Sequence, residues 1–530
     1  METPDGAQYD RVEEVHERRL IAMADVIRIK KKNEVFVTVD CDPSIQNELS
    51  DFFTFFVPGY KFMPAFKNKL WDGKIRLYDR RLKTLYGGLI EYLHEFAETR
   101  SCELEFVDDD YYGRSDAQAF LELDQVRDFV STLNLYAHGK AIEPRDYQLE
   151  AIHHALVHYR AMLLSPTASG KSLIIYVLIR WFLEENPGKK VLLIVPTTSL
   201  VEQMFNDFKD YSTLDESWNN EEACHRIYSG KEKQNINSRV VITTWQSIYK
   251  MHATWFEPYG MVIGDEAHNF KAKSLASILE KMYDAKYRIG TTGTLDGTQT
   301  HKLVLEGLFG PVHRVTTTKA LMDSDALAQL SIDVLLMKYD DLTCQAAKQF
   351  DYQQEIDFIV GNEDRNRFIR NLAIAQEGNC LILYNYVEKH GKPLYDAIDA
   401  KLNEFPRRTR KLFFVSGEVD TNERERIREI TEKEKDAIIV ASMGTFSTGI
   451  NIRNLHVIIF ASPSKSQIRV LQSIGRGLRK SDDGRATKVY DIADDLHWKK
   501  NRNYTLDHAA ERIKLYASEK FEYKIHEVKL

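Results

Sequence analysis

The stretch AMLLSPTASGKSLIIYVLIRWFLEE, residues 161–185, decides the fold of this chain. Four apolar residues precede a loop of small residues, and a long apolar segment of helical length follows the loop. A buried strand that leads through SPTASGKS (165–172) into a helix is the setting of a phosphate-binding loop, where backbone N–H groups surround phosphate oxygens. Ser165 stands where the usual motif has glycine, and a residue that small is sterically tolerated. The residues expected to contact a nucleotide here are Thr167, Ala168, Ser169, Gly170, Lys171 and Ser172.

Strand-like runs recur downstream of this stretch. Short apolar and β-branched runs separated by helix-length segments predict strands buried on both faces of a parallel sheet. One series is KVLLIVP (190–196), RVVITTW (239–245), MVIGDEAH (261–268) and YRIGTTGT (287–294). After a polar stretch around 316–332 the series continues with CLILYN (380–385), KLFFVSG (411–417), AIIVAS (437–442), HVIIFAS (456–462) and KVYDIAD (488–494). The pattern therefore predicts an α/β protein with two tandem parallel-sheet domains, residues 139–325 and 326–500, and a helical tail over 501–530.

Residues 1–138 differ from the rest of the chain in composition and in hydropathy pattern. They are rich in aromatic residues and contain alternating stretches, EVFVTVD (34–40) and KIRLYD (74–79), that are typical of half-exposed strands. We expect them to form a small α+β domain.

Composition limits the classes of protein that fit. The 530 residues carry 72 basic and 79 acidic side chains, a net charge of −7, which argues against a purely electrostatic coat on nucleic acid. The five cysteines are scattered without a CxxC pair, which excludes a disulfide scaffold and a cysteine-rich zinc site. No secretory signal is visible, and no run approaches the ~18 apolar residues of a membrane span. We expect a soluble, cytoplasmic protein without membrane contact.

A pair of carboxylates completes the expected nucleotide site. The strand-like run 261–265 ends in DEAH (265–268), 94 residues after Lys171. In phosphoryl transfer by such sites, Asp265 and the Ser172 hydroxyl would hold Mg²⁺, and Glu266 would orient and deprotonate the attacking water. Lys171 would reach the β- and γ-phosphates. The expected cofactors are ATP and Mg²⁺.

Further motifs stand in a recognisable order. They are RDYQ (145–148), PTTSL (196–200), TTWQS (243–247), TGTL (292–295), ILYNYVEKHG (382–391), SGEV (416–419), SMGTFSTGINI (442–452) and QSIGRGLR (472–479). This order resembles that of superfamily 2 helicases over roughly residues 140–495, and the resemblance implies two RecA-like domains.

The resemblance also implies roles for single residues. Arg145 and Gln148 would contact the adenine side of the nucleotide, and Gln472, Arg476 and Arg479 would act on the nucleotide from the second domain. A guanidinium at the transferring phosphoryl group stabilises its charge. The residues implied in nucleic-acid contact are Thr197, Thr244, Ser416 and Thr445, and those implied in coupling are His268, Thr292, Thr294 and Gly449.

The N-terminal region and one pair of motifs narrow the resemblance to one group of superfamily 2 helicases. FFTFFVPGYKF (52–62) and LWDGKIRLYD (70–79), together with the pairing of TGTL and FSTGIN, look similar to the UvsW-type recombination helicases of tailed phages. That likeness implies 3′-to-5′ translocation and the remodelling of forks, Holliday junctions, D-loops and R-loops in recombination, repair and replication restart. It implies that the partners are single-stranded and branched DNA and RNA–DNA hybrids, and that a single-strand-binding or small accessory protein is a further candidate partner. It also implies that the protein is a monomer and acts in the host cytoplasm.

A basic aromatic segment lies outside all of these motifs. Residues 60–83 carry eight Lys/Arg against two Asp. We expect phosphate contacts from Lys67, Lys69, Lys74 and Arg76. For Trp71 the sequence leaves two roles, stacking on DNA bases or packing in the core of the domain. Phe62 and Phe66 are expected to pack in that core.

Two other functions remain to be weighed. A double-stranded DNA translocase without strand separation would carry the same core motifs, although no nuclease cluster of the restriction type is visible. A non-catalytic nucleic-acid binder with a silent ATPase is the third reading, and the intact Lys171, Asp265, Glu266 and Arg479 argue against it.

Overall fold

The structure is a computed structural model of the chain. It describes all residues except 1–24, 108–120, 138, 167, 229–232, 234–235, 294, 296–298, 325–328, 406–409, 417–432, 444–453 and 464–484. The chain divides into two compact units, one of residues 1–164 and 170–315 and the other of residues 165–169 and 316–530. No helix in the described ranges is both long and apolar enough to cross a membrane.

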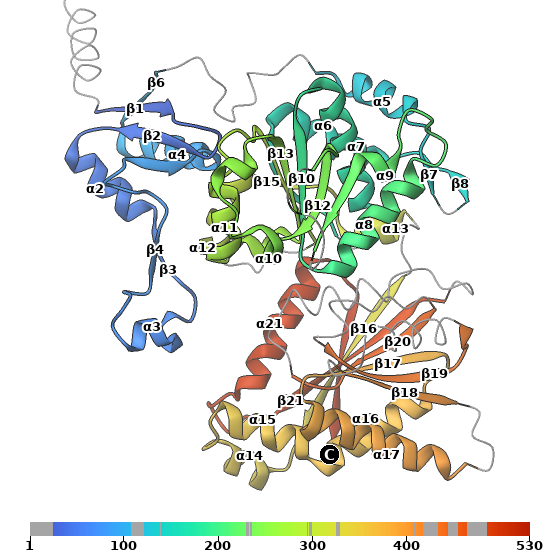
Figure 1. The fold of residues 1–530 in the computed structure, drawn as a ribbon. Helices are drawn as coiled ribbons and strands as arrows, with labels where there is room; N and C mark the ends of the chain where they lie inside the picture. Colours follow the sequence, from blue (N-terminus) through green and yellow to red (C-terminus); the bar gives the residue numbers. More distant parts are fainter. Residues whose placement is uncertain are drawn as a thin grey trace, which may run out of the picture. The chain divides into compact units, whose positions relative to one another are not determined.

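The N-terminal part of the first unit contains a four-stranded sheet, here called the front sheet, in the order β5-β2-β1-β6 (Figure 1). Its strands are β1 (Val26–Lys31), β2 (Phe36–Asp40), β5 (Thr84–Tyr86) and β6 (Glu103–Phe106). Helices α2 (Pro43–Phe52) and α4 (Ile90–Arg100) complete the fold. The inward residues of β1 and β2 alternate along the strands, so that Ile27, Ile29, Val37 and Val39 are buried. The small α+β domain expected from the sequence is confirmed.

A projection leaves this front sheet, and we call residues 54–76 the arm. It consists of β3 (Thr54–Phe56) paired antiparallel with β4 (Lys74–Arg76), a 3₁₀ turn η1 (Tyr60–Phe62) and the short helix α3 (Pro64–Lys67). In Figure 1 the arm extends away from the front sheet.

The front sheet is attached to the rest of its unit by close contacts. Gly88 lies so near α12 (Gln299–Phe309) that a Cβ there would meet Glu306 O at 2.0 Å. The hydroxyls of Tyr86 and Tyr92 donate hydrogen bonds of 2.6 Å to Glu280 and Glu306. The front sheet and the first α/β sheet are therefore packed as one body.

The first α/β sheet has seven parallel strands in the order β11-β12-β10-β13-β14-β9-β15. The strands are β9 (Arg160–Leu164), β10 (Lys190–Val195), β11 (Cys224–Ile227), β12 (Val240–Thr244), β13 (Tyr259–Asp265), β14 (Tyr287–Thr292) and β15 (Val312–Arg314). The five runs expected as strands are confirmed, and β11 and β15 were not expected. Around the sheet lie α5 (Leu123–Thr132), α6 (Asp146–His158), α7 (Lys171–Glu185), α8 (Thr198–Tyr211), α9 (Asn220–Ala223), α10 (Trp245–Ile248), η4 (Ala253–Phe256), η5 (Ala267–Lys271), α11 (Lys273–Glu280) and the small ribbon of β7 (Tyr136–Ala137) and β8 (Lys140–Ala141).

The second α/β sheet also has seven strands, in the order β18-β19-β17-β20-β21-β16-β22. They are β16 (Leu330–Lys338), β17 (Asn379–Tyr384), β18 (Lys411–Val415), β19 (Ala437–Ser442), β20 (Leu455–Phe460), β21 (Thr487–Asp495) and β22 (Tyr523–Lys529). The helices are α13 (Thr318–Asp323), α14 (Asp341–Ala347), α15 (Tyr352–Gly361), α16 (Glu363–Ala375), the π turn η6 (Val387–Gly391), α17 (Lys392–Asn403) and α21 (Tyr504–Ser518). Two parallel sheets in tandem confirm the expected fold class.

The expectation of a wholly helical segment over 501–530 is wrong for its last part. After α21, strand β22 pairs parallel with β16 from Ile332↔Tyr523 to Lys338↔Lys529. Without β22, one side of β16 would present an open row of backbone N–H and C=O groups, and the added strand pairs with that row. β16 was itself overlooked, because its first residues fall in the stretch read as polar.

Candidate nucleotide site and nucleic-acid surfaces

The loop between β9 and α7 has the backbone of a phosphate-binding loop. Gly170 is the N-cap of α7 with φ 82°, a left-handed conformation that favours glycine, and Ala168 has φ 66°. Gly170 also allows a close approach, because a Cβ there would meet Gln148 Nε2 at 2.1 Å. Lys171 and Ser172 are the first residues of the helix, where backbone N–H groups have no partner within the helix. Thr167 lies outside the described residues.

Gln148 is placed against this loop by its own helix. The side chain is buried in the first turn of α6, and its Oε1 accepts the backbone N–H of Arg145 at 2.8 Å. The guanidinium of Arg145 donates to the hydroxyl of Tyr147 at 2.9 Å. The two residues expected on the adenine side are thus in contact with each other, and Gln148 lies beside Gly170.

The two carboxylates stand at the carboxyl end of β13. Asp265 is buried, and its Oδ1 accepts a hydrogen bond of 2.8 Å from the hydroxyl of Thr291 on β14. Burial raises the pKa of Asp265, the charge of Glu266 raises it further, and the charge of Lys171 opposes both. Glu266 has φ 49°, a left-handed backbone that costs a non-glycine residue energy and is frequent at functional sites. Lys171 Nζ lies 3.8 Å from Glu266 Oε1.

His268 lies between this acidic pair and the next motif. His268 Nδ1 lies 2.9 Å from the hydroxyl of Thr292, at the end of β14, and 3.4 Å from Glu266 Oε2. His268 and Thr292 were expected to couple hydrolysis to movement, and the structure brings them into contact. Thr294 lies outside the described residues.

The residues at this edge fit ATP and Mg²⁺. Glu266 Oε2 is buried and, within the described part of the chain, receives no hydrogen bond, so one carboxylate oxygen is unsatisfied by the protein. Two adjacent carboxylates repel each other, and a divalent cation held by Asp265 and Ser172 would relieve that repulsion. The ammonium of Lys171 beside Glu266 supplies one fixed positive charge.

Ser172, the expected second Mg²⁺ ligand, has a partner that the sequence did not reveal. Its hydroxyl lies 2.8 Å from the hydroxyl of Tyr211, the last residue of α8. Tyr211 packs beside Tyr176 of α7 with ring centroids 5.6 Å apart. The two hydroxyls are 39 residues apart in the sequence, and no local pattern connects them.

The residues expected to contact nucleic acid in the first unit begin helices at one edge of the sheet. Thr197 is the N-cap of α8, following β10, and Thr244 is the N-cap of α10, following β12. Val195 of β10 is paired with Thr244, so the two helix starts are neighbours. Thr197 is partly exposed, whereas Thr244 is buried with its hydroxyl 3.1 Å from that of Ser247. Direct contact through the Thr244 hydroxyl stays a prediction.

In the second unit a buried polar network fixes the chain next to the expected arginine motif. His390 is fully buried, with Nδ1 2.8 Å from Ser462 Oγ and Nε2 3.1 Å from Asn366 Oδ1. Asn385 donates its backbone N–H to Ser462 and its side-chain amide to Pro463 O. Burial lowers the pKa of His390 to about 3, so the ring is neutral. Residues 464–484 follow directly after Pro463.

The remaining expected site residues are Ser416 and five residues outside the described part of the chain. Ser416 follows β18 and is buried. The residues that lie outside the described part of the chain are Thr445, Gly449, Gln472, Arg476 and Arg479. Their roles stay predictions.

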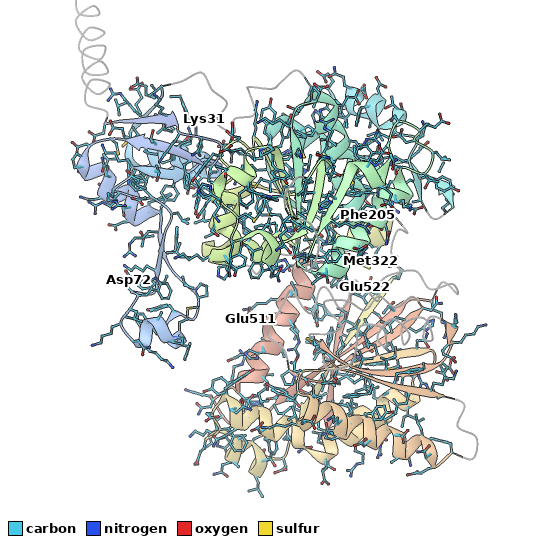
Figure 2. All side chains as sticks on the ribbon, in the orientation of Figure 1. Lys31, Asp72, Phe205, Met322, Glu511 and Glu522 are labelled. Carbon is cyan, nitrogen blue, oxygen red and sulfur yellow. The ribbon has the colours of Figure 1, made fainter. Side chains whose placement is uncertain are left out.

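The arm carries the basic aromatic segment. Trp71 is half-buried, and its indole Nε1 donates to Lys74 O at 2.8 Å, which fixes the turn that leads into β4. Arg76 is paired with Asp72, which Figure 2 labels on the arm, and Lys74 Nζ lies 5.0 Å from the centre of the Phe56 ring. Lys67 and Lys69 are exposed near the tip.

One expectation for the arm is wrong. Phe62 does not pack in a core but is 80% exposed, because no part of the described chain forms a second layer over it. Phe66 is half-buried and packs edge-on against Tyr60, with ring centroids 4.8 Å apart.

Three family models match the chain. They are those for the res subunit of type III restriction enzymes over residues 141–297, the N-terminal region of the DNA helicase UvsW over residues 26–107, and the conserved C-terminal helicase domain over residues 364–481.

Relatives and a solved structure agree with these matches. The chain is 35% identical over 510 residues to the ATP-dependent DNA helicase uvsW of Enterobacteria phage T4, covering 93% of this chain and 98% of the relative. It is 24% identical over 374 residues to the DNA 3′-5′ translocase XPB2 of Sulfurisphaera tokodaii, covering 64% and 80%. The crystal structure of T4 UvsW is similar with a TM-score of 0.50 and 34% identity, covering 95% of this chain and 99% of that one. The likeness thus extends over the front sheet and both α/β sheets.

Proposed function

Because the chain belongs to the UvsW family of ATP-dependent DNA helicases, we propose that it moves 3′ to 5′ along DNA and unwinds and remodels branched DNA. The substrates in this proposal are forks, Holliday junctions, D-loops and R-loops, met during recombination, repair and replication restart. We propose that the protein acts as a monomer in the host cytoplasm, with a single-strand-binding or small accessory protein as a candidate partner.

The chemistry of the proposal rests on the edge where β9, β13 and β14 end. When bound with ATP, Mg²⁺ would neutralise charge on the β- and γ-phosphates, held by Ser172 and Asp265. Glu266 would orient the attacking water and accept its proton, and Lys171 would hold the terminal phosphates. The adenine would lie against Gln148 and Arg145.

The second domain would complete catalysis. In the proposal, Arg476 and Arg479 reach the phosphates and Gln472 contacts the nucleotide when the domains close. Thr445 and Ser416 would contact the DNA strand together with Thr197 and Thr244, and Gly449 and Thr294 would help couple hydrolysis to movement. The proposed domain limits are residues 1–138, 139–325, 326–500 and 501–530.

The single observation that carries this proposal is the contact between His268 and Thr292, 2.9 Å apart beside Glu266. It links the group that would activate water to β14, one of the strands at the same sheet edge as β9. A motor needs such a link, because a change at the terminal phosphate must alter the protein conformation to do mechanical work. A silent nucleotide binder has no use for it.

The test is an unwinding assay on the full chain with 3′-tailed and 5′-tailed partial duplexes, forks, four-way junctions and R-loops. We expect ATP-dependent unwinding of the 3′-tailed duplex and of the branched substrates, and little of the 5′-tailed duplex. Lys171→Ala is the matched control without hydrolysis. A wild-type protein that hydrolyses ATP on DNA and displaces a triplex-forming strand but separates no duplex would instead be a translocase.

A further inference from the structure

The tip of the arm exposes large apolar side chains. Phe62 and Leu70 are each 80% exposed, and Met63 between them is 37% exposed. Single exposed apolar residues are ordinary on protein surfaces, but a group of them at the end of a projection marks an interaction site. The three residues lie at the η1–α3 end of the arm, away from the β3–β4 pair that joins the arm to the front sheet.

The inner aromatic residues account for the arm's own stability. Tyr60 stacks on Phe56 with ring centroids 4.7 Å apart and an angle of 25°, and Phe66 packs edge-on against Tyr60 at 88°. Gly73 has φ 80°, and a Cβ there would meet the Tyr60 ring at 2.3 Å, so the chain closes tightly over this ring. Together with the Trp71 hydrogen bond, these contacts stabilise the arm without Phe62 or Leu70.

The charge around the tip indicates which molecule would cover it. Lys61, Lys67 and Lys69 are exposed and lie within a few residues of Phe62 or Leu70 in the sequence, and residues 57–71 contain no acidic side chain. A surface that combines lysines with an exposed aromatic ring suits a polyanion with flat apolar faces. Nucleic acid at a point where bases are unstacked has both properties.

The attachment of the arm suits a part that must resist force. The front sheet is fixed to the first α/β sheet through Gly88, Tyr86 and Tyr92. A rigid element on the same body as the first α/β sheet stays in place while the motor pulls DNA against it.

We propose that Phe62 and Leu70 form a wedge that enters the base stack at the branch point of DNA, while Lys61, Lys67 and Lys69 bind the flanking phosphates. Apolar side chains inserted at a base step unstack it, and an aromatic face replaces the lost stacking partner. The inference rests on the proposed function and assigns strand separation to the arm. It also moves the stacking role considered for Trp71 to Phe62.

The test compares the wild-type chain with a Phe62→Ser/Leu70→Ser variant. The control is Leu342→Ser, a leucine on α14 that is 79% exposed and distant in sequence from the arm. We expect the arm variant to unwind forks at least about fivefold more slowly, from the loss of one stacked base, with ATPase on saturating single strands unchanged. Because both side chains are exposed, the melting temperature should also stay unchanged.

A second measurement detects the unstacking of the junction base by fluorescence. A 2-aminopurine base placed at the fork junction should brighten when the wild-type chain binds without ATP, and stay quenched at saturation with the arm variant. Lys67→Ala/Lys69→Ala should weaken binding and its salt dependence but retain the brightening at saturation.

The outcomes separate the two proposals. If the wild-type chain neither hydrolyses ATP on DNA nor unwinds it, the proposed function fails. If the wild-type unwinds forks and the folded arm variant matches it in rate and fluorescence, the wedge is overturned. Loss only of stimulation by a single-strand-binding protein would overturn it in favour of a protein-docking surface.

Discussion

Tyr211→Phe is expected to weaken the apparent affinity of the nucleotide site for Mg²⁺ by about two- to twelvefold. A serine that ligates a cation offers a lone pair, so its proton must point elsewhere, and the Tyr211 oxygen 2.8 Å from Ser172 Oγ is placed to accept it. Losing one such partly buried hydrogen bond costs about 0.5–1.5 kcal/mol, and about 1.4 kcal/mol is tenfold in affinity. Burial raises the pKa of Tyr211 to about 12, so its hydroxyl stays protonated at neutral pH.

The assay is a Mg²⁺ titration of fluorescent ADP binding, repeated with steady-state ATPase. Tyr176→Phe is the matched control, because that hydroxyl accepts a hydrogen bond from Arg180 on the same helix and none from Ser172 in the described structure. In a Ser172→Ala background the Tyr211→Phe change should have no further effect. A Mg²⁺ dependence equal to wild type, or an undiminished effect without the serine hydroxyl, would refute the reasoning.

Four other results are expected. Lys171→Ala should abolish ATP turnover, and Glu266→Gln should bind ATP without hydrolysing it, as steady-state ATPase and nucleotide-binding assays will show. Arg479→Ala should lower kcat by about 10³ or more with a smaller change in nucleotide affinity, and normal turnover would place the catalytic cation elsewhere. Acid should destabilise the first unit. The ring of His154 stacks on that of His313 with centroids 3.9 Å apart, and burial lowers the pKa of His154 from 6.5 to about 3. The unfolded chain then binds the proton first, so this stability is complete above about pH 6.5 and is lost towards about pH 3, which urea midpoints will measure.

The strands and the nucleotide site were predictable because their signals are local. The apolar run that begins at residue 161 and the four runs of the first series are buried on both faces, so each is a continuous apolar stretch in the sequence. The phosphate-binding loop and the acidic pair each lie directly at a strand end. β22 gave no such signal, since most of its residues are exposed and it is specified by pairing with β16.

Contacts between residues that are far apart in the sequence could not be predicted from it. Tyr211 lies near Ser172 only because α7 and α8 pack together, and Thr291 bonds Asp265 only because β13 and β14 are neighbours. The exposure of Phe62 could not be read from an aromatic-rich segment, because sequence does not tell whether a second layer covers a hairpin.

The position of β16 in its sheet has a consequence for folding during translation. Leu330 begins a strand whose partner on one side starts at Thr487, and whose partner on the other side starts at Tyr523. At ~5–20 residues per second, roughly seven to thirty seconds pass after the synthesis of β16 before either neighbouring strand has been synthesised. During that interval a nascent chain displays an apolar strand with both edges open, so we expect this segment to recruit chaperones during translation.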